Sequence, residues 1–103
     1  MGKLVLKPNP TFQKAVDVPV AGGEPAQITF TFRHRSRDDL AAWRATLGER
    51  PDVEIIPEMA TAWDLAEPFD AENIAILAQN YQGAGRAMYT AYIEELMALR
   101  LGN

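Results

Sequence analysis

The fold of this chain is decided by one stretch, Gln27-Ile28-Thr29-Phe30-Thr31-Phe32-Arg33-His34, in which apolar and polar residues alternate. Alternation with a period of two is typical of a strand that buries one face, so the isoleucine and both phenylalanines are expected in a core. Residues 14–20 alternate in the same way, with valines on one side, and Pro19 places this strand at a sheet edge. Because residues 21–25 form a glycine- and proline-containing loop between them, the two strands predict an antiparallel β-hairpin.

A hairpin alone is marginally stable in water, so its apolar face needs cover from the segments that follow. Ser36 is the expected N-cap of a first helix, which carries Leu40, Trp43 and Leu47 on one side and ends at Gly48. We expect this helix to pack against the apolar face of the hairpin, because the segment that joins them is short.

Three further helical patterns follow. Residues 52–63 have apolar residues at helical spacing and predict a helix that is kinked or interrupted at Pro57. Asp70 is the expected N-cap of the next helix, and the glycines of residues 83–85 separate it from a last helix over residues 84–101. The predicted fold class is therefore α+β: an N-terminal antiparallel β-hairpin or small sheet followed by three to four helices packed on one face.

The composition fits one small domain and excludes several classes of protein. With 103 residues, 48% of them hydrophobic, residues 1–103 are expected to form a single domain with a modest core. No apolar run approaches the roughly 18 residues of a membrane span, so we expect neither a membrane span nor a signal peptide. The sequence has no cysteine, which excludes disulfides, thiolate metal sites and thiol nucleophiles.

Charge is segregated along the chain, whose net charge is −4. Residues 1–37 carry six lysines and arginines against two acidic residues, whereas residues 49–72 carry eight acidic residues against one arginine. We expect the two segments to meet in the fold, because opposite charges partly cancel when they are close. The alternative is a nucleic-acid patch on the basic cluster Arg33, His34, Arg35 and Arg37. The net negative charge disfavours it, since such binding depends on phosphate neutralisation.

No catalytic, metal or cofactor site is predicted. A zinc site draws on several histidine or cysteine ligands, and His34 is the single histidine of a chain without cysteine. The acidic residues between 64 and 72 lack the spacing and the glycine of a calcium-binding loop. The serines and threonines have no base near them in the sequence to activate a nucleophile. We therefore expect neither a cofactor nor enzymatic activity.

The last predicted helix carries more apolar residues than one core-facing row needs. They form two adjacent rows: Met88, Tyr92, Leu96 and Leu99 in one, and Tyr89, Ile93, Met97 and Leu101 in the other. An ordinary surface helix needs a single apolar face of about 100°. Either this helix is central in the fold, or part of it docks a partner or another copy of the chain.

Four stretches, in order along nearly the whole chain, carry a family resemblance. They are Asn9-Pro10-Thr11-Phe12; residues 30–40; Trp63-Asp64-Leu65 with Pro68-Phe69 and Glu72-Asn73; and Asn80-Tyr81 with Ala91-Tyr92 and residues 100–103. With these residues the chain resembles the tail assembly chaperones of long-tailed bacteriophages and prophages, which are small acidic proteins encoded just before the tape measure protein.

The resemblance implies a protein that is neither an enzyme nor a part of the finished tail. Such chaperones bind the long, hydrophobic tape measure protein in the host bacterial cytoplasm, keep it soluble and help to recruit major tail tube protein subunits around it. Several are made in two lengths by a programmed ribosomal frameshift. The alternative function, from another class, is a small nucleic-acid-binding regulator that uses the basic cluster.

The resemblance and the surplus apolar row together suggest a binding surface. We expect the row of Tyr89, Ile93, Met97 and Leu101 to remain partly exposed and to dock either the tape measure protein or a second copy, which makes a homo-oligomer the expected state. Trp63 and Phe69 mark the other candidate surface.

Overall fold

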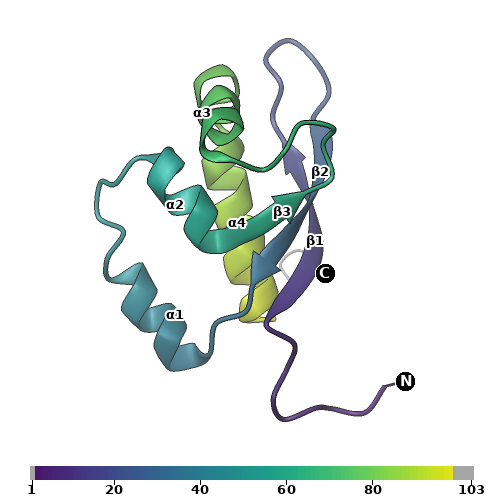
Figure 1. The fold of residues 1–103 in the computed structure, drawn as a ribbon, viewed down its shortest axis with the longest axis vertical. Helices are drawn as coiled ribbons and strands as arrows, with labels where there is room; N and C mark the ends of the chain where they lie inside the picture. The colour runs from purple at the N-terminus through teal and green to yellow at the C-terminus, as the bar shows by residue number, and fades with distance from the viewer. Residues whose placement is uncertain (1, 99–103) are drawn as a thin grey trace.

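The computed structural model describes residues 2–98, and in that range strands and helices are interspersed (Figure 1). The strands are β1 (Thr11–Val18), β2 (Ala26–Arg33) and β3 (Ala60–Trp63). The helices are α1 (Arg37–Arg44), α2 (Asp52–Met59), α3 (Ala71–Asn80) and α4 (Ala84–Leu96). The α+β class predicted from the sequence is confirmed.

The described strands form one antiparallel sheet in the order β1-β2-β3, with β2 in the centre. β1 and β2 pair without interruption from Thr11 opposite Arg33 to Val18 opposite Ala26. The predicted hairpin is therefore confirmed, although its first strand begins earlier than residue 14 and ends before Pro19. The apolar side chains of β2 lie on the core face, where Phe30 and Phe32 are fully buried.

β3 contradicts the prediction of a helix over residues 52–63. The helix ends at Met59, and the next four residues form a strand whose Ala60, Ala62 and Trp63 pair antiparallel with β2, so that Trp63 lies opposite Phe30. The free edge of β2 supplies hydrogen-bond partners for these residues, and tertiary pairing overrides the local helical spacing. Pro57 is accommodated inside α2, close to its C-terminal end.

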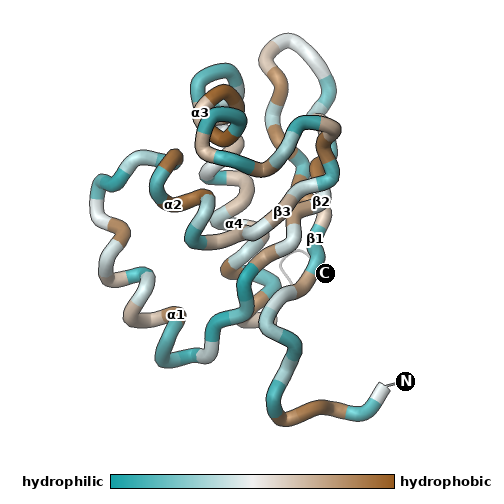
Figure 2. The backbone as a smooth tube through the Cα atoms, viewed as in Figure 1, coloured by the Kyte–Doolittle hydropathy of each residue, from teal (hydrophilic) through white to brown (hydrophobic). Residues whose placement is uncertain are grey.

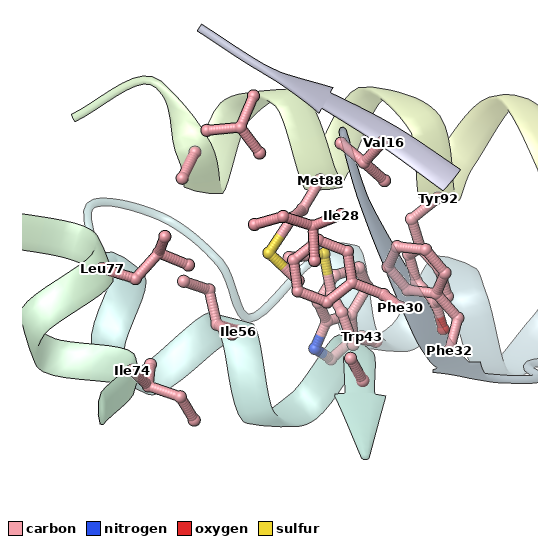
Figure 3. Packing of buried hydrophobic residues seen from close by; sticks show 14 of the residues in the cluster. Val16, Ile28, Phe30, Phe32, Trp43, Ile56, Ile74, Leu77, Met88 and Tyr92 are labelled. Carbon is pink, nitrogen blue, oxygen red and sulfur yellow. The ribbon is translucent and has the colours of Figure 1, made fainter. Parts of the chain in front are cut away.

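The core lies between one face of the sheet and the helices (Figure 3). Leu40 and Trp43 of α1 belong to the same buried cluster as Phe30, and Leu47 packs against it partly buried. The ring of Trp43 contacts Tyr89 and Tyr92 of α4, so the expected direct packing of the first helix on the hairpin stays a prediction. The main cover, however, comes from other helices. α4 lies along β1, and α2 packs against β2 and β3. α1 therefore contributes side chains to the core from its edge and does not cover the sheet.

Two predicted helix starts are confirmed by their caps. The Ser36 hydroxyl accepts a hydrogen bond from the backbone N–H of Asp39 at 3.1 Å, and the Asp70 carboxylate accepts one from the N–H of Asn73 at 2.9 Å. The predicted end of the first helix at Gly48 is wrong, because α1 ends at Arg44. Gly48 instead lies in the loop before α2, with a positive φ of 44° that suits glycine.

Candidate apolar docking site

An apolar groove opens where α3 stands beside the sheet. It has a volume of about 470 Å³, and we call it the α3 groove; its lining comprises Val18, Val20, Ala26, Gln27, Ile28, Trp63, Leu65, Glu67, Asn73, Ile76, Leu77 and Tyr81. Three of its large apolar side chains are well exposed: Leu65 at 38%, Ile76 at 50% and Tyr81 at 40%. Several anchoring side chains are thus open to a partner in one concave surface.

Trp63, at the end of β3, links the groove to the segment before α3. Its indole N–H donates a hydrogen bond to the carbonyl of Glu67 at 2.7 Å, and the ring of Phe69 packs against it edge-on at 5.0 Å. The Asn73 side chain donates a hydrogen bond to the carbonyl of Pro68 at 2.9 Å. Of the two residues predicted for this surface, Trp63 lines the groove, whereas Phe69 contacts Trp63 without lining it.

The α3 groove has one charged residue among its described lining residues, and that residue is acidic. Glu67 lines it, and among the described lining residues no lysine or arginine occurs. Asp64 follows Trp63 directly and accepts a hydrogen bond from the backbone N–H of Thr29 at 2.9 Å. Glu72 lies in the first turn of α3, beside groove-lining Asn73, but does not itself line the groove. The groove therefore favours an apolar ligand that carries positive charge.

The two predicted rows of α4 differ in burial. Met88 and Tyr92 of the first row are fully buried, and Leu96 is partly buried. In the second row Tyr89 and Ile93 are half-buried and Met97 is 49% exposed. Leu99 of the first row and Leu101 of the second lie outside the described residues.

α1 covers the N-terminal end of this second row, which we call the α4 outer row. The rings of Tyr89 and Trp43 lie 6.1 Å apart, and the Arg44 side chain donates a hydrogen bond to the Tyr89 hydroxyl at 3.1 Å. Met97, the C-cap residue of α4, lies about two helical turns beyond Tyr89. The described part of the row is therefore open mainly at its C-terminal end.

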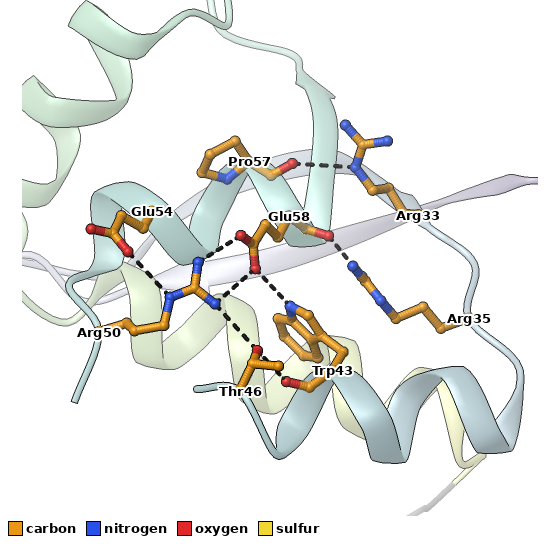
Figure 4. A network of polar contacts seen from close by, with 8 residues as sticks. All are labelled: Arg33, Arg35, Trp43, Thr46, Arg50, Glu54, Pro57 and Glu58. Carbon is orange, nitrogen blue, oxygen red and sulfur yellow. Dashed lines mark hydrogen bonds and ion pairs between the residues drawn. The ribbon is translucent and has the colours of Figure 1, made fainter. Parts of the chain in front are cut away.

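The basic cluster meets the acidic segment in the fold, as expected, but through backbone rather than through carboxylates. Arg33 donates a hydrogen bond to the carbonyl of Pro57 at 3.2 Å, and Arg35 donates one to the carbonyl of Glu58 at 2.7 Å (Figure 4). These carbonyls lie in the last turn of α2, where a helix leaves acceptors unpaired and carries partial negative charge. The two arginines thus stabilise the C-terminal end of α2.

Arg35 makes two further contacts inside the protein. Its guanidinium lies 4.6 Å from the ring centroid of Trp43, and it donates a hydrogen bond to the Tyr92 hydroxyl at 2.8 Å. That hydroxyl in turn donates to the carbonyl of Arg33 at 2.7 Å. Burial raises the pKa of Tyr92 above its usual value, so the phenol stays protonated and keeps donating this bond.

Glu58 is the centre of the polar network in Figure 4. Its carboxylate accepts hydrogen bonds from Arg50 at 2.6 and 3.2 Å and from the Trp43 indole at 2.9 Å. The hydrogen bond from Arg50, and after it the one from Trp43, holds the pKa of Glu58 below its usual range. The carboxylate therefore remains an ionised structural acceptor that joins α1, α2 and the loop between them.

A model of one protein family matches residues 1–103, and its description is phage tail assembly chaperone. The chain belongs to that family. The resemblance seen in the sequence is thereby confirmed, and membership implies partners among phage tail proteins and points to a non-enzymatic role. Comparison with curated proteins and comparison with solved structures give no match.

Sequence reasoning found only part of this family member's apolar surface. It identified Trp63, but it missed Leu65, Ile76 and Tyr81 as exposed groove residues. Ile76 was the available signal, because it is a large apolar residue outside the row that faces the core at Ile74 and Leu77. Tyr81 continues the spacing of Ile74 and Leu77 in the sequence, but α3 ends one residue before it and its side chain is exposed.

The described residues were also compared with the requirements of a metal site and of a membrane-spanning helix. Between residues 2 and 98, no group of three or more histidine, cysteine or acidic side chains could hold a metal ion. No helix in this range has the length and apolar character that crossing a membrane requires.

Proposed function

We propose that this chaperone binds the tape measure protein of a long-tailed phage in the host bacterial cytoplasm. It keeps that protein soluble, helps to recruit major tail tube protein subunits around it, and is absent from the finished tail. Family membership supports phage tail proteins as the partners. Self-association at high concentration is part of this proposal, because exposed apolar surface is then covered until the tail partner arrives.

The observation that carries the proposal is the open, apolar α3 groove with Glu67 in its lining. Grooves of this kind accept an amphipathic segment through a few apolar anchors, with Trp63 and Ile76 as the contact points here. The α4 outer row, with Tyr89, Ile93, Met97 and Leu101, is the second proposed contact. Met97 is its most exposed described member.

The nucleic-acid alternative gains no support from the geometry of the basic cluster. Arg33 and Arg35 both donate hydrogen bonds to the end of α2, and Arg35 also lies against Trp43. Arg37 is exposed and paired with Asp38 at 3.4 Å. Two of the four basic residues are thus committed to contacts within the chain.

Co-expression with the tape measure protein encoded beside it tests the proposed function. Ile76→Asp places a charge in the groove at a half-exposed position, and Val53→Asp is the matched control at an exposed apolar position on α2 that does not line the groove. We expect the wild type and Val53→Asp to keep the tape measure protein in the soluble fraction. Ile76→Asp should lower that fraction several-fold while its melting temperature stays near that of the wild type.

Met97→Asp tests the second surface in the same assay, because its side chain is half-exposed and its loss leaves the core intact. The chaperone role is refuted if the tape measure protein is equally insoluble with and without the wild-type chain. If Ile76→Asp solubilises it as well as Val53→Asp does, the groove is not the binding surface.

A further inference from the structure

The segment before β1 carries an unusually exposed apolar run. Leu4, Val5 and Leu6 are 88%, 66% and 91% exposed, and Figure 2 shows them as a hydrophobic stretch of the chain that extends away from the body of the molecule. Lys3 and Lys7 flank them on either side. Adjacent aliphatic side chains left in water in this way mark a segment that lacks its binding surface.

The α3 groove complements this segment in both shape and charge. It offers exposed apolar side chains at Leu65, Ile76 and Tyr81, and its lining contains Glu67 but no basic residue among those described. Residues 2–16 contain three lysines and no acidic residue. An extended Lys-Leu-Val-Leu-Lys segment directs its two leucines to the same side, so both could enter the groove while the lysines lie near its acidic rim.

The segment cannot fill the groove of its own chain, although groove-lining Trp63, which pairs with Phe30 opposite Lys14, lies nearer to the start of β1. It leaves the sheet at the start of β1, whereas Val18 and Val20 of the groove lie at the other end of that strand, near α3 (Figure 1). The eight residues of β1 span roughly 26 Å. The chain from Leu6 to Thr11 spans about 17 Å at most, even when fully extended. α4 also lies along β1 and blocks the direct path over the core face.

We infer that residues 3–7 of one copy dock in the α3 groove of a second copy, with Leu4 and Leu6 as the anchors. Two copies that exchange these segments reciprocally form a closed dimer, in which both grooves are filled. The inference rests on the self-association in the proposed function and supplies its surface. Because the tail partner is proposed to bind the same groove, it would have to displace the exchanged segment.

Sedimentation of the purified chain over a range of concentrations tests the exchange. Leu4→Asp/Leu6→Asp removes the anchors at positions that make no core contact, and Ile76→Asp disables the groove. Each change should weaken self-association at least about 100-fold, since burial of two leucines or of the groove is lost. Val53→Asp should associate as the wild type does. Tyr81→Ser is the second groove variant if Ile76→Asp unfolds, as judged by circular dichroism.

Mixing provides the decisive measurement. The segment variant keeps an intact groove and the groove variant keeps an intact segment, so an equal mixture at high concentration should form a heterodimer held by one docked segment. This heterodimer should be weaker than the wild-type dimer, whereas each variant alone is monomeric. A mixture that remains monomeric, a wild-type chain that remains monomeric, or a segment variant that associates like the wild type overturns the inference. These measurements contain no tape measure protein, so their outcome is separate from that of the co-expression assay.

Discussion

Replacing Phe30 by alanine tests the core on which the fold depends. Phe30 is fully buried in the central strand, and its ring lies 5.7 Å from that of Phe32 and 6.3 Å from that of Trp63. The sheet holds it on two sides and helices cover it, so its surroundings have little freedom to close over a cavity. Phe→Ala changes in such positions cost about 3–5 kcal/mol, and we expect a loss in this range.

Urea unfolding followed by circular dichroism measures the change in the free energy of unfolding. Thr31→Ala is the matched control, because the adjacent residue in the same strand points to the other face and its loss should cost about 1 kcal/mol or less. Phe30→Leu keeps an aliphatic side chain and should fall between the two. A small domain has only about 5–15 kcal/mol of stability, so this milder variant keeps the series measurable if the alanine variant unfolds.

The proposed packing is refuted in either of two cases. The first is that Phe30→Ala lies within about 1 kcal/mol of the wild type, which is far below the cost of a buried cavity. The second is that Thr31→Ala is as destabilising as Phe30→Ala, because the two faces of β2 would then not differ in burial.

Two further predictions concern α2 and the elements that contact it. The pKa of Glu58 is lower in the folded protein than in the unfolded chain, so its ionised carboxylate stabilises the fold. This contribution is complete above the ordinary glutamate pKa of about 4.3 and is lost as the pH falls through the lower pKa of the folded protein. The stability difference between the wild type and Glu58→Gln, from urea unfolding, should therefore be largest at neutral pH and shrink in acid; a constant difference contradicts this. Gly85→Ala should stabilise the protein by less than the about 1 kcal/mol by which alanine favours helices, because its Cβ would meet the carboxylate of Asp52, which must turn away. In the Asp52→Ala background the same change should stabilise more, and an equal effect in both backgrounds would show that Asp52 is not an obstacle.

Part of the docking surface could be predicted from the sequence and part could not. Trp63 was identified as a candidate, but the groove that it lines also needs Ile76 from α3 and Val18 from β1. Those residues are far apart along the chain, and local spacing carries no information about which of them meet. The surplus of apolar residues on the last helix was visible in the sequence, whereas the coverage of Tyr89 by α1 followed only from the packing.

The sequence by itself determined the α+β class, the hairpin and two helix starts. Each depends on residues close together in the chain: the alternation around Phe30, and the hydroxyl or carboxylate that caps the helices at Ser36 and Asp70. Because the residues of each such signal lie close together in the chain, the element can be predicted without knowing which segments pack against it.

Only the tertiary structure decided the third strand, the main cover of the sheet and the use of the basic cluster. Residues 60–63 continue a helical pattern in the sequence, yet they become β3 because the free edge of β2 offers them hydrogen-bond partners. Arg33 and Arg35 stabilise the carbonyl end of α2 because the fold brings that end beside β2. In each case the deciding interaction joins segments distant in the chain, and its free energy exceeds the local preference that the sequence displays.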